Sequence, residues 1–319
     1  MGSGGGDDVD SDVTTSGEAT GYRFSRDPRN PLPSSGGWTI VTDERIHRAD
    51  SADGTVIVGR VHGQGPALVL VHGALPDGDI AWEAMVPHLS DRFTCYLPSL
   101  RGRGLSEASQ DHSPPRLVED VRAFVDSIGG PVFLVGWSAG VPWALAAAAL
   151  SGAVTAVAGY EPTIIPLMRG DDTARRDAMY RQLGEAAADG RLADAARAFH
   201  ALVCNENEIA ALEADYFERC AASVPALLQA AQQGASYEGP LSTDPEVLEK
   251  ITAPFLLLRG QETELDTFYT DTERYVAEQV IDPHVGLPLP GLGHLGPRLA
   301  PEPIAHELVS FFESVRQSS

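Results

Sequence analysis

Ser138 has the sequence surroundings of a serine that acts as a nucleophile. It is the centre of a Gly-Trp-Ser-Ala-Gly segment at 136–140, which follows an apolar, strand-like run at 132–136 and leads into a helix-like stretch at 139–151. In a G-x-S-x-G segment the serine stands on a sharp strand-to-helix turn, and a Cβ at either glycine would collide with neighbouring strands or the helix. The turn lifts Ser138 above the sheet edge, at a helix N-terminus that favours developing negative charge. The spacing predicts acyl transfer with Ser138 as nucleophile.

His294 is the histidine best placed along the chain to act as the base. It follows Gly-Leu-Gly at 291–293, after a short apolar segment and before an amphipathic stretch at 301–316 that predicts the last helix. A histidine on a glycine-flanked loop after the last strand can reach a serine displayed by a central strand, as a general base must. Of the nine histidines, His284 is the second candidate and is interpreted as a surface residue.

The segment His72-Gly73-Ala74 directly follows an apolar run at 67–71. At this place the backbone N–H of Ala74 can pair with that of Ala139 to hold the oxyanion of a tetrahedral intermediate. One such donor is typically worth roughly 10²- to 10³-fold in rate. His72 itself is interpreted as a structural hydrogen-bonding residue under this loop.

Two tryptophans are candidates for the wall of an apolar acyl or ring pocket. Trp137 precedes the predicted nucleophile, and Trp82 lies on the first predicted helix. Aromatic residues near a core also serve as packing, so both interpretations stay open for each tryptophan.

The elements that must position these residues alternate between strand and helix. Short apolar runs typical of parallel strands buried on both faces are ALVLV at 67–71, FTCYL at 93–97, VFLVG at 132–136, AVTAVAGY at 153–160 and FLLLR at 255–259. Between them, helices are predicted at 80–90, at 113–128 with Ser113 as N-cap and Pro114 first, and at 139–151. The pattern predicts an α/β fold whose mostly parallel central sheet is flanked by helices, with its site at the carboxyl ends of the strands.

Three further segments complete the predicted organisation. Residues 38–62 alternate in polarity around a turn at Asp53-Gly54, which predicts an antiparallel hairpin. Residues 163–250 are rich in alanine and helical in period, which predicts an all-helical lid between the two parts of the core, 37–162 and 251–319. Within the lid, helices are predicted at about 173–188, 191–203, 206–219 and 223–233. Residues 1–36, rich in Gly, Ser and Asp, are predicted to be a flexible tail.

Composition limits the partners. Apolar residues make up 43% of the chain, as in an ordinary globular protein, and the net charge of −22 argues against nucleic acid and anionic membranes. The uncharged stretch 131–160 is divided by glycines into strand and helix lengths, so it does not predict a membrane span. Cys95, Cys204 and Cys220 show no zinc-site or disulfide spacing, and no secretory signal is visible, so we expect a cytoplasmic protein. A homodimer is left open.

Together these motifs resemble those of the α/β-hydrolase superfamily over about residues 38–316. The segments that carry the resemblance are His-Gly at 72–73, Ser-Leu-Arg-Gly-Arg-Gly-Leu-Ser at 99–106, Gly-Trp-Ser-Ala-Gly at 136–140 and Gly-Leu-Gly-His at 291–294. The resemblance implies the α/β-hydrolase fold and a serine, histidine and acid triad. Relatives usually carry Asp at the position of Ser99, a departure expected to affect loop packing more than chemistry.

The acid of the triad needs a separate argument, because the usual aspartate is missing. Relatives commonly place Asp three residues after the glycine that ends the penultimate strand, and in this chain that residue is Thr263. A subset of the superfamily, including lactone hydrolases acting on zearalenone, resembles this chain in carrying its Glu where Glu161 stands, before a proline. Glu161 is therefore the predicted acid. The alternatives nearby are Glu262 first, then Glu264 and Asp266.

The resemblance implies a serine hydrolase acting on a small-molecule carboxylic ester or lactone through an acyl-enzyme on Ser138, without a metal or organic cofactor. Relatives that use an alkyl-enzyme route to open epoxides or remove halogens carry Asp at the position of Ser138, which disfavours those reactions. Three alternatives stay open: a cofactor-free lyase, a perhydrolase on the same triad, or a non-catalytic ligand-binding protein of the same fold.

Overall fold

The computed structural model describes residues 1–2 and 45–318 of the 319-residue chain. The chain divides into two units, residues 1–44 and 45–319, and the sheet and its helices all belong to the second. The predicted tail, beyond its first two residues, and residues 38–44 of the predicted hairpin lie outside the described residues, whereas the rest of the hairpin is confirmed as two antiparallel strands.

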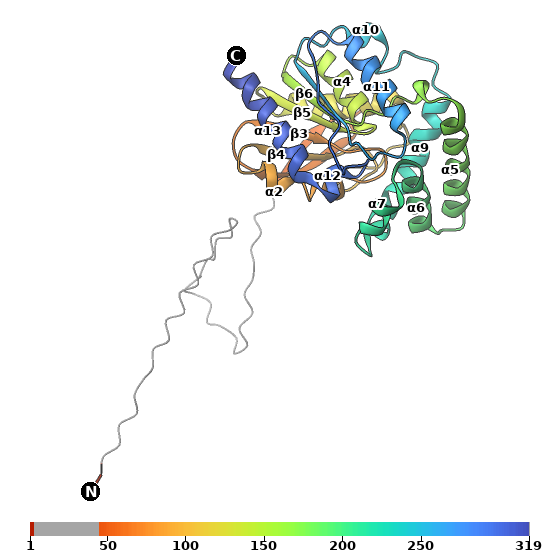
Figure 1. Ribbon diagram of the computed structural model, residues 1–319, viewed down its shortest axis with the longest axis horizontal. Coiled ribbons are helices and arrows are strands. Elements are labelled where there is room, and N and C mark those ends of the chain that lie inside the picture. Colours follow the sequence, from red (N-terminus) through yellow and green to blue (C-terminus); the bar gives the residue numbers. More distant parts are fainter. Residues whose placement is uncertain (3–44, 319) are drawn as a thin grey trace. The chain divides into compact units, whose positions relative to one another are not determined.

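An eight-stranded sheet forms the centre of this unit, with the strand order β1-β2-β4-β3-β5-β6-β7-β8 (Figure 1). The strands are β1 (Arg45–Asp50), β2 (Val56–Gly63), β3 (Ala67–Val71), β4 (Thr94–Ser99), β5 (Val132–Trp137), β6 (Val154–Tyr160), β7 (Phe255–Leu258) and β8 (Pro283–Val285). Strand β2 is antiparallel to β1 and β4, and all other neighbours are parallel. The predicted mostly parallel sheet and all five of its predicted strands are confirmed to within two residues at either end.

The inner strands are buried on both faces, as their apolar runs predict. In β3, Leu68 and Leu70 belong to one apolar cluster, whereas Val69 and Val71 belong to another. Successive side chains of a strand point to opposite faces, so the two clusters are the cores above and below the sheet. A sheet covered on both sides presents only strand ends to a ligand, and this confines the site to that edge.

Helices cover both faces of the sheet. They are α1 (Gly78–Trp82), α2 (Val86–Leu89), α3 (Pro114–Ser127), α4 (Gly140–Leu150), α11 (Asp266–Gln279), α12 (Gly296–Leu299) and α13 (Pro301–Ser318). Ile304 and Leu308 of α13 pack in the cluster of Leu68, while Phe124 of α3 packs in the cluster of Val69. No helix among the described residues is long and apolar enough to cross a membrane.

Two helix predictions needed correction in detail. The helix predicted at 80–90 is two short helices, α1 and α2, because Pro87 in the first turn of α2 has no N–H to continue a ladder. Pro114 does begin α3, but the side chain of Ser113 at the N-cap position makes no capping hydrogen bond.

Every element between β6 and β7 is helical, and residues 163–250 are called the helical insertion. Its elements are η1 (Ile165–Leu167), α5 (Gly170–Ala188), α6 (Leu192–Val203), α7 (Glu206–Ala211), α8 (Tyr216–Cys220), η2 (Ala221–Ser223), α9 (Val224–Ala235) and α10 (Pro245–Leu248). Helices α5, α6, α7 and α9 gather beside the sheet, drawn in green to teal in Figure 1. The single helix predicted at 206–219 is interrupted after Ala211, and its role as a lid stays a prediction.

The loop at 99–106 is fastened to the body of the fold by a buried ion pair. Arg101 and Asp120 of α3 have fully buried side chains, and their closest N–O distance is 2.6 Å. From the same loop, the backbone N–H of Leu100 donates to His72 Nε2 (3.0 Å), and Arg103 donates to the carbonyl of Ala74 (2.7 Å). The ion pair therefore supports the loop on which the predicted oxyanion donor Ala74 lies.

We expect Asp120→Ala to lower the free energy of unfolding by about 3 kcal/mol, because it leaves a buried guanidinium without its closest partner. The matched control is Glu119→Ala on the same helix, whose partly exposed pair with Arg116 should contribute less than about 1 kcal/mol. Urea unfolding followed by circular dichroism measures both variants. Equal losses would mean that the buried pair has no special importance.

Candidate active site

Ser138 occupies a strained turn between β5 and α4. Its φ is 57°, in the left-handed region that non-glycine residues rarely adopt. A Cβ on Gly136 would lie 2.6 Å from the backbone of α4, and a Cβ on Gly140 would lie 2.5 Å from the carbonyls of β3 and of His72. The two glycines therefore allow the close contacts that hold Ser138 above the sheet edge.

Glu161 occupies a second strained turn, at the end of the neighbouring strand β6, with φ of 49°. Its side chain is fully buried and accepts three hydrogen bonds. They come from the backbone N–H of Gly260 (3.0 Å), the hydroxyl of Thr263 (3.2 Å) and Nδ1 of His294 (2.7 Å). Since Nδ1 carries the proton that it donates, Nε2 of the neutral ring is left as an acceptor.

The loop of His294 is held by groups from several elements. Tyr160 donates its hydroxyl to the carbonyl of Gly293 (2.6 Å), and Trp137 donates its indole N–H to the carbonyl of His294 (3.0 Å). The ring of Tyr269 stacks on that of His294, with centroids 5.3 Å apart and planes 14° apart. Trp137 and Tyr160 are paired residues at the ends of β5 and β6, so the sheet itself fixes the base.

Glu208 of α7 holds the same loop from the helical insertion. Its carboxylate accepts from the backbone N–H of Leu295 (2.6 Å) and, as part of a capping box, from that of Asn205 (3.0 Å). Gly293 packs against this carboxylate, because a Cβ there would lie 2.6 Å from it. Burial raises the pKa of Glu208, and the two backbone donors oppose that shift. The insertion thus contacts the backbone on both sides of His294.

The hydroxyl of Ser138 is hydrogen bonded to Oγ1 of Thr163 at 3.0 Å. Within residues 45–318, no hydrogen bond joins Ser138 to His294, although both side chains line one cavity. The free space of this cavity is about 20 Å³, enough for roughly one water.

The predicted oxyanion donors lie beside the nucleophile. Gly73 packs against Ser138, since a Cβ there would lie 3.4 Å from the Cβ of the serine, and Ala74 lines the cavity. Among the described residues, neither Ala74 nor Ala139 donates its backbone N–H to another group of the protein. His72 is buried with both ring nitrogens engaged, and burial lowers its pKa to about 3. It is therefore a neutral structural residue, in keeping with the sequence interpretation.

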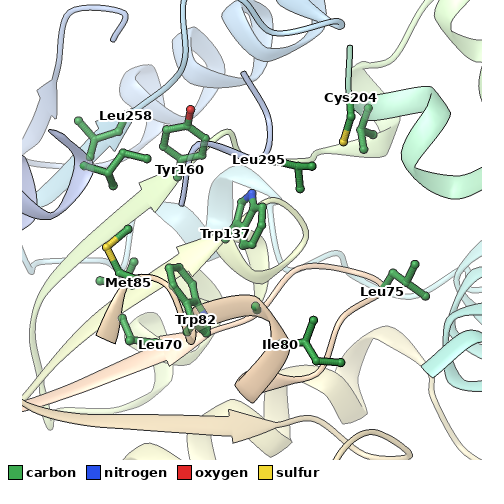
Figure 2. Packing of buried hydrophobic residues seen from close by; sticks show 14 of the residues in the cluster. Leu70, Leu75, Ile80, Trp82, Met85, Trp137, Tyr160, Cys204, Leu258 and Leu295 are labelled. Atoms are coloured by element: carbon green, nitrogen blue, oxygen red, sulfur yellow. The ribbon is translucent and has the colours of Figure 1, made fainter. Parts of the chain in front are cut away.

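The remaining candidates lie away from His294. Glu262 is exposed, Glu264 pairs with Arg175 and Asp266 pairs with Arg259, while His284 is half exposed on β8 beside Asp282. Trp82 is not among the residues that line the cavity: it lies behind Trp137, with ring centroids 5.8 Å apart (Figure 2). Of the two tryptophans, only Trp137 reaches the pocket wall.

Among the residues that the sequence analysis missed, four contact Ser138, His294 or the loop of His294: Tyr160, Thr163, Glu208 and Tyr269. Of these four, only Glu208 lies in a recognisable sequence pattern, because Asn205 three residues before it completes the pattern of a capping box. That pattern supports the predicted helix start at 206, but it does not indicate contact with His294. No group of three or more His, Cys, Asp or Glu residues in the described part of the chain is arranged to hold a metal ion.

The sheet order, the strand-to-helix turn at Ser138 and the helical insertion after β6 define an α/β-hydrolase fold. A family model described as "Alpha/beta hydrolase family" matches residues 68–307, so the chain belongs to that family.

Curated relatives match over a shorter part. Pimeloyl-[acyl-carrier protein] methyl ester esterase from Stenotrophomonas maltophilia (strain K279a) is 36% identical over 126 residues, which cover 39% of this chain and 47% of the relative. The enzyme of that name from Methylococcus capsulatus is 38% identical over 96 residues, which cover 30% of this chain and 36% of the relative. The chain thus spans less than half the length of these relatives.

Solved structures match over most of the described chain. A thermophilic esterase from Thermogutta terrifontis has a TM-score of 0.66 at 21% identity, covering 85% of this chain and 99% of the esterase. An alpha/beta hydrolase from Sphaerobacter thermophilus has a TM-score of 0.63 at 24% identity, and the match covers 83% of this chain and 100% of that hydrolase. At these identities the likeness shows the fold.

We expect Glu161→Gln to lower kcat toward an aryl ester on the order of 10⁴-fold, because an amide neither sets the tautomer of His294 nor stabilises its cation. Glu262→Gln is the matched control and should retain nearly full activity, since its side chain is exposed. Circular dichroism verifies folding of both. A larger loss in the Glu262 variant would identify that residue as the acid.

Glu208→Ala should lower kcat by roughly 10- to 100-fold, because a loop that shifts by about 1 Å misplaces the base. Glu208→Gln keeps an acceptor for the N–H of Leu295, so its kcat should be much closer to the wild-type value than that of Glu208→Ala. Glu206→Ala, in the same turn of α7 but exposed, is the control for helix stability. If the Glu206 and Glu208 variants lose equal activity, Glu208 acts only through the stability of α7.

Proposed function

We propose that this protein is a serine hydrolase of carboxylic esters, with Ser138 as nucleophile, His294 as general base and Glu161 as the acid that orients the base. The observation that carries the proposal is the 2.7 Å hydrogen bond from His294 to a carboxylate with three donors, beside a cavity that His294 shares with Ser138. The esterase names of the curated relatives support an ester as substrate.

In the proposed reaction the hydroxyl of Ser138 first leaves its hydrogen bond with Thr163 and donates a hydrogen bond to His294 Nε2. Such a catalytic hydrogen bond often forms only when substrate binds. Ser138 Oγ then bonds to the ester carbonyl carbon while its proton passes to Nε2. The oxyanion is held by the backbone N–H groups of Ala74 and Ala139. Collapse of the intermediate breaks the bond to the alcohol, which takes the proton from His294 and leaves an acyl-enzyme.

Water completes the cycle by the same route. His294 takes a proton from the water as its oxygen attacks the acyl carbon, and the proton then returns to Ser138 Oγ as the acid is released. Throughout, Glu161 stabilises the imidazolium by charge, while its carboxylate accepts hydrogen bonds from Gly260 and Thr263. A lactone fits the same sequence of steps, with acid and alcohol leaving as one molecule.

We expect Ser138→Ala to lower turnover of an aryl ester by roughly 10³-fold or more and to abolish labelling by a fluorophosphonate, with folding intact. Near-normal turnover by this variant would remove the proposal. Mass spectrometry of the wild-type protein quenched during turnover should show the acyl group on Ser138. Turnover without any acyl-enzyme would favour a lyase, and a product formed only with peroxide would favour a perhydrolase.

A further inference from the structure

The wall that the helical insertion contributes to the cavity contains a buried polar pair. His200 of α6 and Tyr216 of α8 both line the cavity, with exposed fractions of 3% and 1%, and His200 Nε2 lies 3.1 Å from the hydroxyl of Tyr216. The other wall residues from the insertion, Phe199 and Val203, are apolar. The catalytic mechanism does not use this pair, although both residues line the cavity together with Ser138.

The hydrogen positions of the pair follow from its contacts. His200 Nδ1 lies 2.9 Å from the carbonyl of Ala196, which can only accept, so Nδ1 carries the proton. Burial lowers the pKa of His200 to about 4, so the ring is neutral near pH 7 and Nε2 has no proton. Tyr216 must therefore donate to Nε2. Its oxygen then has lone pairs but no hydrogen left for another group.

The Tyr216 ring is held in place by two neighbouring side chains. The guanidinium of Arg298 lies over it, 4.7 Å from the centroid, and Arg298 is itself fixed by Glu83 and Glu213. The ring of Phe217 meets it edge to face at 5.5 Å. The thiol of Cys220, a weak donor, is the other polar group beside the hydroxyl. An acceptor fixed in this way is preorganised for a ligand.

We propose that the Tyr216 oxygen accepts a hydrogen bond from the substrate, so that the enzyme prefers esters with a hydroxyl or amide N–H in the part that lies against the insertion. This inference rests on the proposed function and names the substrate class. An isostere with a methyl group in place of the donor leaves the buried Tyr216 oxygen with only the weak donor Cys220 beside it, which should cost about 10-fold in kcat/KM.

The test compares three matched pairs of esters, of which the first two are p-nitrophenyl esters. The pair 3-hydroxybutanoate and 3-methylbutanoate exchanges a hydroxyl for a methyl group of similar size, and the 2-hydroxy and 2-methyl esters move the donor. On the alcohol side, 2-hydroxyethyl and propyl butanoate form the third pair. Wild-type enzyme should prefer the donor by about 10-fold in at least one pair.

Two variants then assign that preference. Tyr216→Phe should reduce the ratio of kcat/KM within the preferred pair toward 1. His200→Phe leaves the Tyr216 hydroxyl free to donate, so the preference should turn toward the 3-oxobutanoate ester, which only accepts. Tyr180→Phe, a tyrosine of α5 that is not among the residues lining the cavity, is the control and should keep the wild-type ratio.

The outcomes separate the two proposals. A wild-type protein that hydrolyses esters and is labelled by fluorophosphonate, but shows a ratio near 1 in all three pairs, would overturn the substrate class alone. An equal loss of kcat/KM on both esters of a matched pair in the Tyr216→Phe variant would overturn it too. That result would show that the hydrogen bond between His200 and Tyr216 only braces α6 against α8. Absence of both labelling and hydrolysis would instead remove the proposed function.

Discussion

A carboxylate buried at the end of a central strand must be surrounded by donors, because an ion taken out of water without partners costs several kcal/mol. Glu161 satisfies this requirement with three donors from two segments, namely Gly260 and Thr263 in the loop after β7, and His294. Each donor must be brought to the carboxylate by the fold. The positions of β6, β7 and the loop after β8 are therefore linked through one side chain. Thr263 belongs to the same network as a donor to Glu161.

The loop of His294 connects the sheet and the helical insertion. Tyr160 and Trp137 bind two of its carbonyls from the strand ends, and Glu208 binds the next N–H from α7. The interruption between α7 and α8 follows from this arrangement, since Glu208 reaches Leu295 while Glu213 reaches Arg298. A straight helix over 206–219 would not direct both carboxylates to one short segment. Contact between the insertion and the base makes positioning of His294 sensitive to the insertion.

The cavity has little free space, and its walls are of two kinds. On the sheet side lie the nucleophile and the loop with Ala74, where developing charge would be held. On the insertion side lie apolar residues and the pair of His200 with Tyr216. A substrate must displace side chains to enter, because the free space holds roughly one water. Residues of the insertion therefore contact whatever extends beyond the ester group.

The sequence by itself determined the sheet, the turn at Ser138 and the positions of Glu161 and His294 along the chain, because these depend on local patterns. Apolar runs bounded by glycine predict buried strands, and the glycines at 136 and 140 are needed for contacts within a strand-turn-helix unit. Only the tertiary structure decided which carboxylate meets His294, where α7 ends, and that Trp82 lies behind Trp137. Glu161 and His294 are 133 residues apart, and by local sequence Glu262 stayed open as the first alternative to Glu161. Contacts between distant segments depend on how strands and loops are placed in space, and hydrophobic periodicity carries no information about that.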